Sequence, residues 1–413
     1  MTLVPHLRYQ PHMQTKRFLR QPFGIVLFVS ATVFSACGSD QEPREVTVSP
    51  ISTEVLLERG PYGVGYLETV LEDTSRPTMA NRSFPGSSSR VLPASVWYPA
   101  EVSSDGEPLE RRNVPFALRA APAPVVVYSH GFLGNRRGGT YIGRHLASHG
   151  YVVAAVDFPL SSFNAPGGAT LGDLANQPGD VRFLLDTLLE ASEPAFGPFA
   201  GVLDRNRIGL TGLSLGGATT LLATFHPTLR DPRVRAAVAF APPACFFGRS
   251  FYATARVPVA IVHGDLDAIV PYEANALFAF SQAQPPKYLF TLKLGNHTAF
   301  TDGADILFGQ MTNADDLGCA ALGSALANDP AAPSFVERLG GAAAGIVLGH
   351  CPLPCPHGSR NPPSMSPRRQ LDLAKAIALA HFEAWLRGTM AARAWEETQA
   401  TVENPDLDVS WQR

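Results

Sequence analysis

The sequence predicts an α/β fold with a mostly parallel central sheet, and two kinds of segment support this prediction. Short, continuous apolar runs are typical of strands that are buried on both faces of a parallel sheet. Such runs occupy residues 124–129, 151–156, 208–211, 234–240, 257–262 and 288–294. Helical patterns lie between several of them, at 141–149, at 180–189 and after residue 214. Strands that alternate with helices indicate parallel crossover connections, with the helices flanking the sheet.

The part of the chain before these runs has a different pattern. Apolar and polar residues partly alternate over 63–71 and again over 91–98, which predicts an antiparallel hairpin or meander. The segment 100–124 is rich in Pro, Glu, Arg and Ala, so we expect a surface loop there. The predicted domain spans residues 60–395.

Composition excludes some classes of partner. The chain has 413 residues, of which 45% are hydrophobic and 17% charged, so it is long and apolar enough to bury a sizeable core. Its formal net charge is −3. A chain without basic excess has no electrostatic feature that favours nucleic acid, and we expect no nucleic-acid partner.

The N-terminal segment has the features of an export signal. Basic residues precede an apolar run over 23–36, and small residues follow. This order predicts a signal peptide over residues 1–36, with Met13 as the expected start of translation. The apolar run is shorter than the roughly 20 residues that a membrane-spanning helix needs, which argues against a transmembrane anchor.

Cys37 follows Ser35-Ala36 directly, as in the lipobox of bacterial lipoproteins, where this cysteine is lipidated. The resemblance implies an exported protein that Cys37 anchors to a membrane, in the periplasm or on the cell surface. Ordinary secretion is the alternative. Residues 37–59 are polar and rich in Ser, Thr, Glu and Pro, and are expected to form a flexible tether.

Four further cysteines, Cys245, Cys319, Cys351 and Cys355, favour two disulfides in an exported protein. The sequence leaves all three pairings open. Together with His350 and His357, two of these cysteines are also compatible with a metal cluster, but their spacing is poor for a zinc site. We therefore expect no metal.

The region after residue 297 loses the strand–helix alternation. Residues 298–367 are rich in Ala, Gly and Pro and carry three of these four cysteines, which predicts an insertion with some helix of its own. An amphipathic helix is expected over 371–385, and a polar tail over 396–413.

The strand at 208–211 leads into Gly212-Leu213-Ser214-Leu215-Gly216-Gly217, and a helical run follows. This is the strand–turn–helix context of a G-x-S-x-G nucleophile elbow. A serine held on so sharp a turn needs glycine neighbours for steric reasons. The alternative, a chance match of common residues, loses weight if a base and an acid stand at later strand ends.

Such partners follow the next strands. The strand at 257–262 ends in His263-Gly264-Asp265-Leu266-Asp267, and the strand at 288–294 ends in Gly295-Asn296-His297. Asp267, which stands shortly before a Val-Pro pair, is favoured as the acid, and Asp265 is expected to be a turn or capping carboxylate. His297 is favoured as the base because it completes the order Ser, Asp, His.

The remaining histidines fit this order less well. His130 and His263 are expected to shape their loops, and His350, His357 and His381 lie outside the strand-end pattern. Two backbone N–H groups are expected to bind an oxyanion, those of Leu215 and Phe132. Phe132 follows Gly131, which lets the backbone approach a substrate closely.

Residues 63–294 resemble the α/β-hydrolase superfamily, within it the group of platelet-activating-factor acetylhydrolases, dienelactone-hydrolase-like bacterial proteins and cutinase-like polyester hydrolases. Seven motifs in the family's order carry the resemblance: 96–100, 128–132, 147–151, 179–183, 212–217, 263–271 and 295–297. The cysteine-bearing insertion and the lipoprotein-like start depart from the family pattern. Dienelactone hydrolases proper use a cysteine nucleophile, where this chain has Ser214.

The resemblance implies ester hydrolysis through an acyl-enzyme, without metal or organic cofactor. Ser214, His297 and Asp267 are the expected catalytic triad, and the substrate is expected to be a short acyl ester, a lipid or a polyester. Two alternatives stay open at this point. One is a surface lipoprotein that keeps the fold only to bind a ligand or partner, and the other is an amidase or thioesterase with the same triad.

Overall fold

The computed structural model describes residues 49–103, 109–190, 194–327, 329, 335–349, 351–356, 358 and 360–413. The expected signal peptide, Cys37 and most of the expected tether lie outside these residues, as do His350 and His357. Within the described part of the chain, no helix combines the length and hydrophobicity that crossing a membrane requires.

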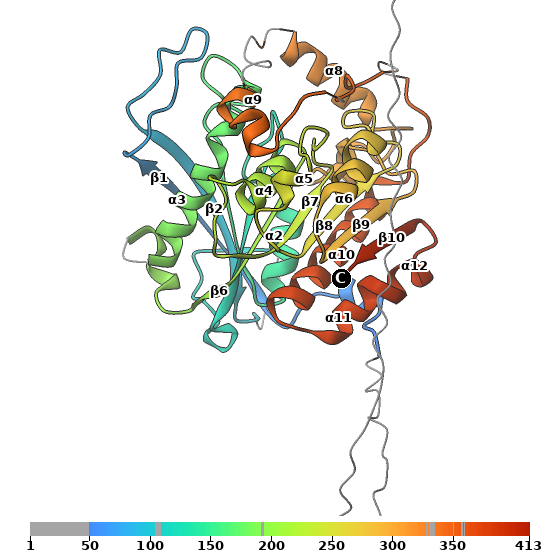
Figure 1. Cartoon of the computed structure of the whole chain (residues 1–413). Coiled ribbons are helices and arrows are strands. Elements are labelled where there is room, and N and C mark those ends of the chain that lie inside the picture. The colour runs from blue at the N-terminus through green and yellow to red at the C-terminus, as the bar shows by residue number, and fades with distance from the viewer. Residues whose placement is uncertain are drawn as a thin grey trace, which may run out of the picture. The chain divides into compact units, whose positions relative to one another are not determined.

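A ten-stranded sheet forms the centre of the molecule, in the order β10-β9-β8-β7-β6-β4-β5-β2-β1-β3 (Figure 1). Its strands are β1 Gly63–Asp73, β2 Arg90–Ala100, β3 Arg111–Arg112, β4 Ala123–Ser129, β5 Val152–Val156, β6 Leu203–Leu213, β7 Val234–Phe240, β8 Val259–Gly264, β9 Lys287–Leu292 and β10 Leu407–Gln412. The six strands from β5 to β9 across the sheet pair in parallel, as the apolar runs predicted. The predicted hairpin is also confirmed, because β1 and β2 pair antiparallel.

Helices cover both faces of the sheet. They are α1 Thr53–Leu57, α2 Thr140–Ser148, α3 Gln177–Glu190, α4 Leu215–Phe225, α5 Arg249–Tyr252, α6 Phe278–Gln282, α7 Ala304–Leu307, α8 Asp315–Leu326, α9 Phe335–Arg338, α10 Pro367–Leu386, α11 Met390–Ala394 and α12 Ala400–Glu403. Helices α2 and α10 pack on one face, and α3 and α4 on the other. The expected helices at 141–149, 180–189 and 371–385 therefore exist as α2, α3 and α10.

The alternation of side chains along each strand explains why the sheet has a hydrophobic core on both of its faces. Successive side chains of a strand point to opposite faces of the sheet. In β4, Val126 and Tyr128 join the core beneath α2 and α10, whereas Val125 and Val127 join the core beneath α3. Each central strand thus buries both of its faces, which is why these strands read as unbroken apolar runs.

The C-terminal segment differs from its prediction. Residues 396–413, expected to be a polar tail, contribute to a π-helical turn over Trp395–Gln399, to α12 and to β10. Strand β10 pairs antiparallel with β9, from Leu407 beside Leu292 to Gln412 beside Lys287. Leu407, Val409 and Trp411 alternate with polar residues, which is the period of an edge strand. Six residues are too short for this alternation to distinguish a strand from a polar tail.

The end of the expected tether also belongs to the folded domain. Residues 53–57 form α1, which contacts α10, and Leu56 is fully buried. The backbone N–H and the hydroxyl of Thr53 both donate to Glu403, each at 2.6 Å. The described domain therefore begins before residue 60, with its first helix tied to α12.

The insertion is a helical segment at one end of the sheet, where α8 and α9 lie above the strands (Figure 1). Two disulfides hold it, Cys245–Cys351 and Cys319–Cys355. The expectation of two disulfides is confirmed, and the structure selects one of the three pairings. The first ties the insertion to the segment after β7, and the second joins two parts of the insertion itself.

Candidate active site

Ser214 occupies a strained turn between β6, which ends at Leu213, and α4, which begins at Leu215. Its backbone has φ 57° and ψ −121°, a combination that non-glycine residues rarely adopt. A Cβ atom at Gly212 would lie 2.3 Å from the carbonyl oxygen of Gly216, and one at Gly216 would lie 2.0 Å from that of Ser129. Only glycine fits at both positions, as the elbow motif predicted.

The sheet brings the expected acid and base together. Asp267 follows β8 and His297 follows β9, and these strands are parallel neighbours, so the two loops emerge at the same edge. His297 Nδ1 lies 2.7 Å from Asp267 Oδ2. Ser214 and His297 line one cavity of about 220 Å³. Ser214 and His297 therefore share a cavity, and Asp267 contacts His297.

Asp267 is a buried carboxylate that meets only donors. Its Oδ1 accepts from the backbone N–H groups of Ile269 and Val270, at 2.9 and 2.6 Å. Its Oδ2 also faces His263 Nε2, at 3.1 Å. Burial alone raises the pKa of Asp267, but the charge of His297 and the bonds from both histidines outweigh it and hold the pKa well below its usual value.

His297 has the electrostatic surroundings of a base. Burial lowers the pKa of its imidazole, but the charge and hydrogen bond of Asp267, together with the charge of Asp315, raise that pKa above its usual value. Because Nδ1 faces Asp267, Nε2 is the ring nitrogen left to exchange a proton with the serine. The ring is thus oriented for proton transfer.

The two candidate acids have different surroundings. Asp265 is exposed, and its Oδ1 accepts from the backbone N–H of Leu294 at 2.6 Å. It closes the turn after β9, as expected of a capping carboxylate. The structure brings Asp267, rather than Asp265, to His297.

The loop after β4 lies against the elbow. A Cβ atom at Gly131 would lie 3.2 Å from Ser214 Cβ, so the backbone of this loop runs beside the serine. The N–H groups of Phe132 and Leu215 donate to no other described residue. Both residues line an apolar cavity together with Ser214, so these two donors are available to an oxyanion there.

His130 fixes this loop. Its Nε2 accepts from the backbone N–H of Phe158 at 3.0 Å, which leaves Nδ1 to donate to the carbonyl of Gly131 at 2.7 Å. Burial lowers the pKa of His130, so the ring is held neutral in this tautomer. This is the loop-shaping role expected for His130.

An apolar cavity of about 360 Å³ adjoins Ser214. Part of its lining comes from the core of the domain, including Phe132, Leu174 and Val270, and part comes from the insertion. The insertion residues include Leu322, Leu326, Leu348, Leu353 and the Cys245–Cys351 disulfide. The insertion therefore completes the site.

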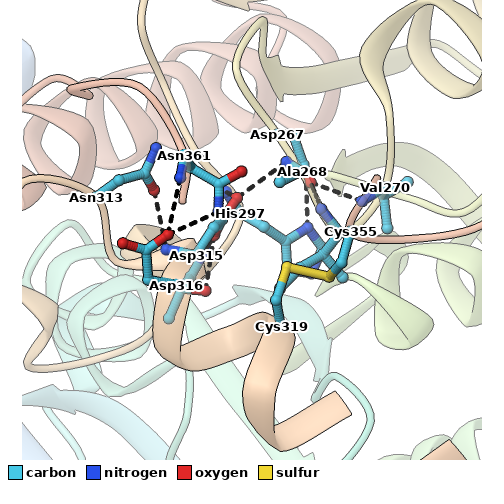
Figure 2. The surroundings of a disulfide bond; sticks show 12 residues. Asp267, Ala268, Val270, His297, Asn313, Asp315, Asp316, Cys319, Cys355 and Asn361 are labelled. Carbon is cyan, nitrogen blue, oxygen red and sulfur yellow. Dashed lines mark hydrogen bonds and ion pairs between the residues drawn. A yellow bond between two sulfur atoms is a disulfide. The ribbon is translucent and has the colours of Figure 1, made fainter. Parts of the chain in front are cut away.

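Some residues of the site gave no signal in the sequence. Asp315, at the start of α8, is buried and bonds to the loops of both Asp267 and His297 (Figure 2). His263 contacts Asp267 directly, beyond the loop-shaping role expected for it. In contrast, the described residues contain no cluster of histidine, cysteine and acidic side chains with the arrangement of a metal site.

Comparison with solved structures agrees with this architecture. A ferulic acid esterase from Streptomyces cinnamoneus superimposes with a TM-score of 0.54 at 22% sequence identity, over 86% of this chain and 97% of the esterase. The chain therefore has the α/β-hydrolase fold. Residues 118–312 of this chain match the family model described as PETase: PET hydrolase-like.

Curated relatives of this chain include cutinases and a bis(hydroxyethyl) terephthalate hydrolase. Cutinase 2 of Thermobifida cellulosilytica is 28% identical over 153 residues, which are 37% of this chain and 51% of the cutinase. A bis(hydroxyethyl) terephthalate hydrolase of Streptomyces coelicolor is 25% identical over 259 residues, which are 63% of this chain and 67% of the relative. The chain spans about half the length of the cutinases that it matches.

Proposed function

We propose that the protein is a serine carboxylester hydrolase that works through an acyl-enzyme. One observation carries this proposal: a strained serine shares one cavity with a histidine that contacts a buried carboxylate, and a second cavity with two backbone N–H groups that donate to no described residue. This is the set of groups that acyl transfer to serine requires. The names of the relatives, which are cutinases and an ester hydrolase, support the same reaction class.

The mechanism follows from the geometry. His297 Nε2 takes the proton of the Ser214 hydroxyl as its oxygen attacks the ester carbonyl, and the N–H groups of Phe132 and Leu215 bind the oxyanion that forms. Asp267 keeps the imidazole in the correct tautomer and stabilises its charged form. The imidazolium then protonates the leaving alcohol, and water repeats the sequence to release the acid.

The substrate that fits best is an ester with an apolar acyl group larger than acetyl. The cavity of about 360 Å³ is lined mainly by leucine, phenylalanine and proline, so it suits an aliphatic chain or an aromatic ring. The cavity of about 220 Å³ contains His297 and several backbone groups, and it suits the alcohol portion. Polyester units such as terephthalate esters meet both requirements.

A fluorophosphonate probe tests the reaction class. We expect it to label the wild type and not Ser214→Ala, because only an activated serine reacts. Loss of the hydroxyl should lower kcat/KM by on the order of 10⁴-fold or more, with the fold intact. A folded wild-type protein that the probe does not label would refute the proposed hydrolase activity. It would favour a catalytically silent protein that keeps the fold to bind a ligand.

A series of nitrophenyl esters tests the substrate class. We expect kcat/KM to increase from acetyl to hexanoyl or octanoyl, and bis(hydroxyethyl) terephthalate to be hydrolysed. Activity that collapses beyond butyryl would contradict the acyl pocket. Matched amides and thioesters in the same assay separate an esterase from an amidase or thioesterase.

We propose further that the protein is exported and anchored to a membrane through lipidated Cys37. The two disulfides support an oxidising compartment, and the order of basic, apolar and small residues before Cys37 supports cleavage there. Mass analysis of the mature N-terminus should find a lipidated Cys37. A peptide that retains residues 34–36 would refute this processing.

A further inference from the structure

The first residue of α8 joins the two loops that carry the acid and the base. Asp315 is fully buried. Its Oδ2 accepts from the backbone N–H groups of Ala268 and His297, at 3.0 and 3.1 Å. Its Oδ1 accepts from the N–H and the hydroxyl of Thr298, both at 2.7 Å. One carboxylate from the insertion thus binds the residue after Asp267, His297 itself and the residue after His297 (Figure 2).

The same face of α8 contacts these loops again one turn later. A Cβ atom at Gly318 would lie 2.3 Å from Thr298 Oγ1 and 2.6 Å from Ile269 Cδ1. Cys319 is bonded to Cys355, whose N–H donates to the carbonyl of Ala268 at 2.6 Å (Figure 2). Residues spaced by three and four positions share one helix face, so Asp315, Gly318 and Cys319 act from the same side.

Capping of the N-terminus of α8 does not account for these contacts. The carboxylate of Asp315 accepts from no N–H group of its own helix, and Ala314 at the N-cap makes no capping bond. All four of its donors belong to the loops after β8 and β9. A buried carboxylate is costly unless it is fully hydrogen-bonded, so its bonds to these loops keep it there.

We propose that Asp315 is a positioning residue that fixes the Asp267 and His297 loops relative to each other and places a second negative charge beside the catalytic imidazole. This inference rests on the proposed function of the triad. It assigns to the insertion a part in proton transfer, in addition to its part in the wall of the acyl pocket.

Two acidic groups contact His297: Asp267 lies against its Nδ1, and Asp315 accepts from its backbone N–H. His263 lies against Asp267. The charge of Asp315 helps to raise the pKa of His297. Burial and the nearby Asp267 raise the pKa of Asp315 itself. Its four donors stabilise the carboxylate, because a protonated oxygen would lose an acceptor position.

The test compares Asp315→Asn with Asp316→Asn in the full mature chain. Asparagine at 315 removes the negative charge. Its NH2 group also replaces one carboxylate oxygen and cannot accept from the N–H groups of the two loops. We expect kcat/KM for a nitrophenyl ester to fall by about 10- to 100-fold, the range for leaving buried groups unpaired. The pKa of His297, followed by NMR of its ring protons and by the acid limb of the pH profile, should decrease.

Asp316 is the matched control, since it lies next in the same helix and its Oδ1 accepts from Asn361 N and Nδ2, at 3.0 and 2.8 Å. An asparagine oxygen keeps both bonds, so activity and the titration of His297 should stay at wild-type values. A folded Asp315→Asn protein with wild-type kcat/KM and an unshifted His297 would overturn the proposal. Equal effects of both variants would also overturn it, because they would indicate general loosening of α8.

The NMR titration separates this proposal from the proposed function. If the wild type hydrolyses no ester but its His297 pKa still falls on Asp315→Asn, the function fails and the bridge by Asp315 stands. If Asp315→Asn does not fold, Thr298→Val replaces it, since that change removes only one donor to Oδ1. A decrease in kcat/KM of about 2- to 10-fold is then expected, and wild-type activity would overturn the proposal.

Discussion

The two halves of the site are held in different ways. Ser214 and the adjacent loop after β4 are fixed by close backbone contacts. The glycines at 212 and 216 leave no space for a side chain, and Gly131 packs closely against the serine. The acid and base loops are fixed by side chains from α8, a helix of the insertion, and by a disulfide of the same segment. The first half is therefore marked by short glycine motifs in the sequence, whereas the second depends on side chains of a segment that no motif marks.

Because the two halves are held differently, substitutions in them should affect catalysis to different degrees. A change in the elbow meets rigid backbone, so it should disturb the serine directly. A change in the insertion meets side chains that act through other residues, so its effect on the chemistry should be indirect and smaller. The predictions below test that contrast, in order of decreasing effect.

The largest effect on kcat/KM is expected from a change at Asp267, the carboxylate that contacts His297. Asp267→Asn should lower kcat/KM by roughly 10³- to 10⁴-fold, because the histidine loses its correct tautomer. In the wild type the raised pKa of His297 means that activity falls as pH decreases through a value above 6.5. Without the Asp267 charge this acid limb should move to lower pH. The pH dependence of nitrophenyl ester hydrolysis measures both effects.

Asp265→Asn is the control for this variant, since Asp265 lies two residues away and is exposed. Its pH profile should keep the wild-type acid limb. A larger loss of kcat/KM in Asp265→Asn than in Asp267→Asn would show that Asp265, and not Asp267, is the acid.

The elbow glycines should be the next most sensitive positions. Gly216→Ala places a methyl group 2.0 Å from the Ser129 carbonyl oxygen, so either β4 or the serine turn must move. We expect a loss of about 1–3 kcal/mol in the free energy of unfolding and a fall of roughly 10²-fold in kcat/KM, comparable to losing an oxyanion donor. Urea unfolding and ester hydrolysis test this together. Wild-type behaviour in both would show that the elbow tolerates a side chain.

Loss of the Cys319–Cys355 disulfide should have a smaller effect on catalysis. The bridge closes a sequence separation of 36 residues, and its removal by paired serine substitutions should cost about 2–4 kcal/mol. Since Asp315 keeps its own bonds, we expect kcat/KM to fall less than in Asp267→Asn. Thermal unfolding and ester hydrolysis measure the two effects, and an unchanged Tm would contradict a bracing role for this disulfide.

The smallest effect is expected at Gly323, which also lies in α8. A Cβ atom there would meet nothing within 4 Å, and the side of the helix is exposed. Gly323→Ala should therefore stabilise the protein by about 0.5–1 kcal/mol, because alanine favours the helix. Activity should be unchanged. Compared with Gly216→Ala, this variant shows whether the site tolerates change in the insertion but not in the elbow.

The sequence predicted the first half of the site better than the second. The elbow is recognisable because its glycines and serine lie within a few residues of each other in the sequence. Asp267 and His297 were predicted because parallel strands end at one edge of the sheet, whatever lies between them. In both cases a rule that spans only a few residues was sufficient.

The parts that the sequence did not predict depend on contacts between distant segments. Asp315 stands in Asn-Ala-Asp-Asp-Leu-Gly, where nothing distinguishes it from the partly exposed Asp316. The pairing of the cysteines depends on how the insertion folds back on the segment after β7. Strand β10 was missed for another reason, because three apolar residues in a polar context are a weak signal until a free edge of β9 receives them.

The direction of strand β10 has a practical consequence for immobilising this protein on a solid support. It runs from Leu407, beside the last residue of β9, back to Gln412, beside the first. The C-terminal Arg413 therefore points away from the edge of the sheet where His297 follows β9. If residue 413 is attached to a solid support, the edge of the sheet at which His297 follows β9 lies at the far end of β9 from the attachment point.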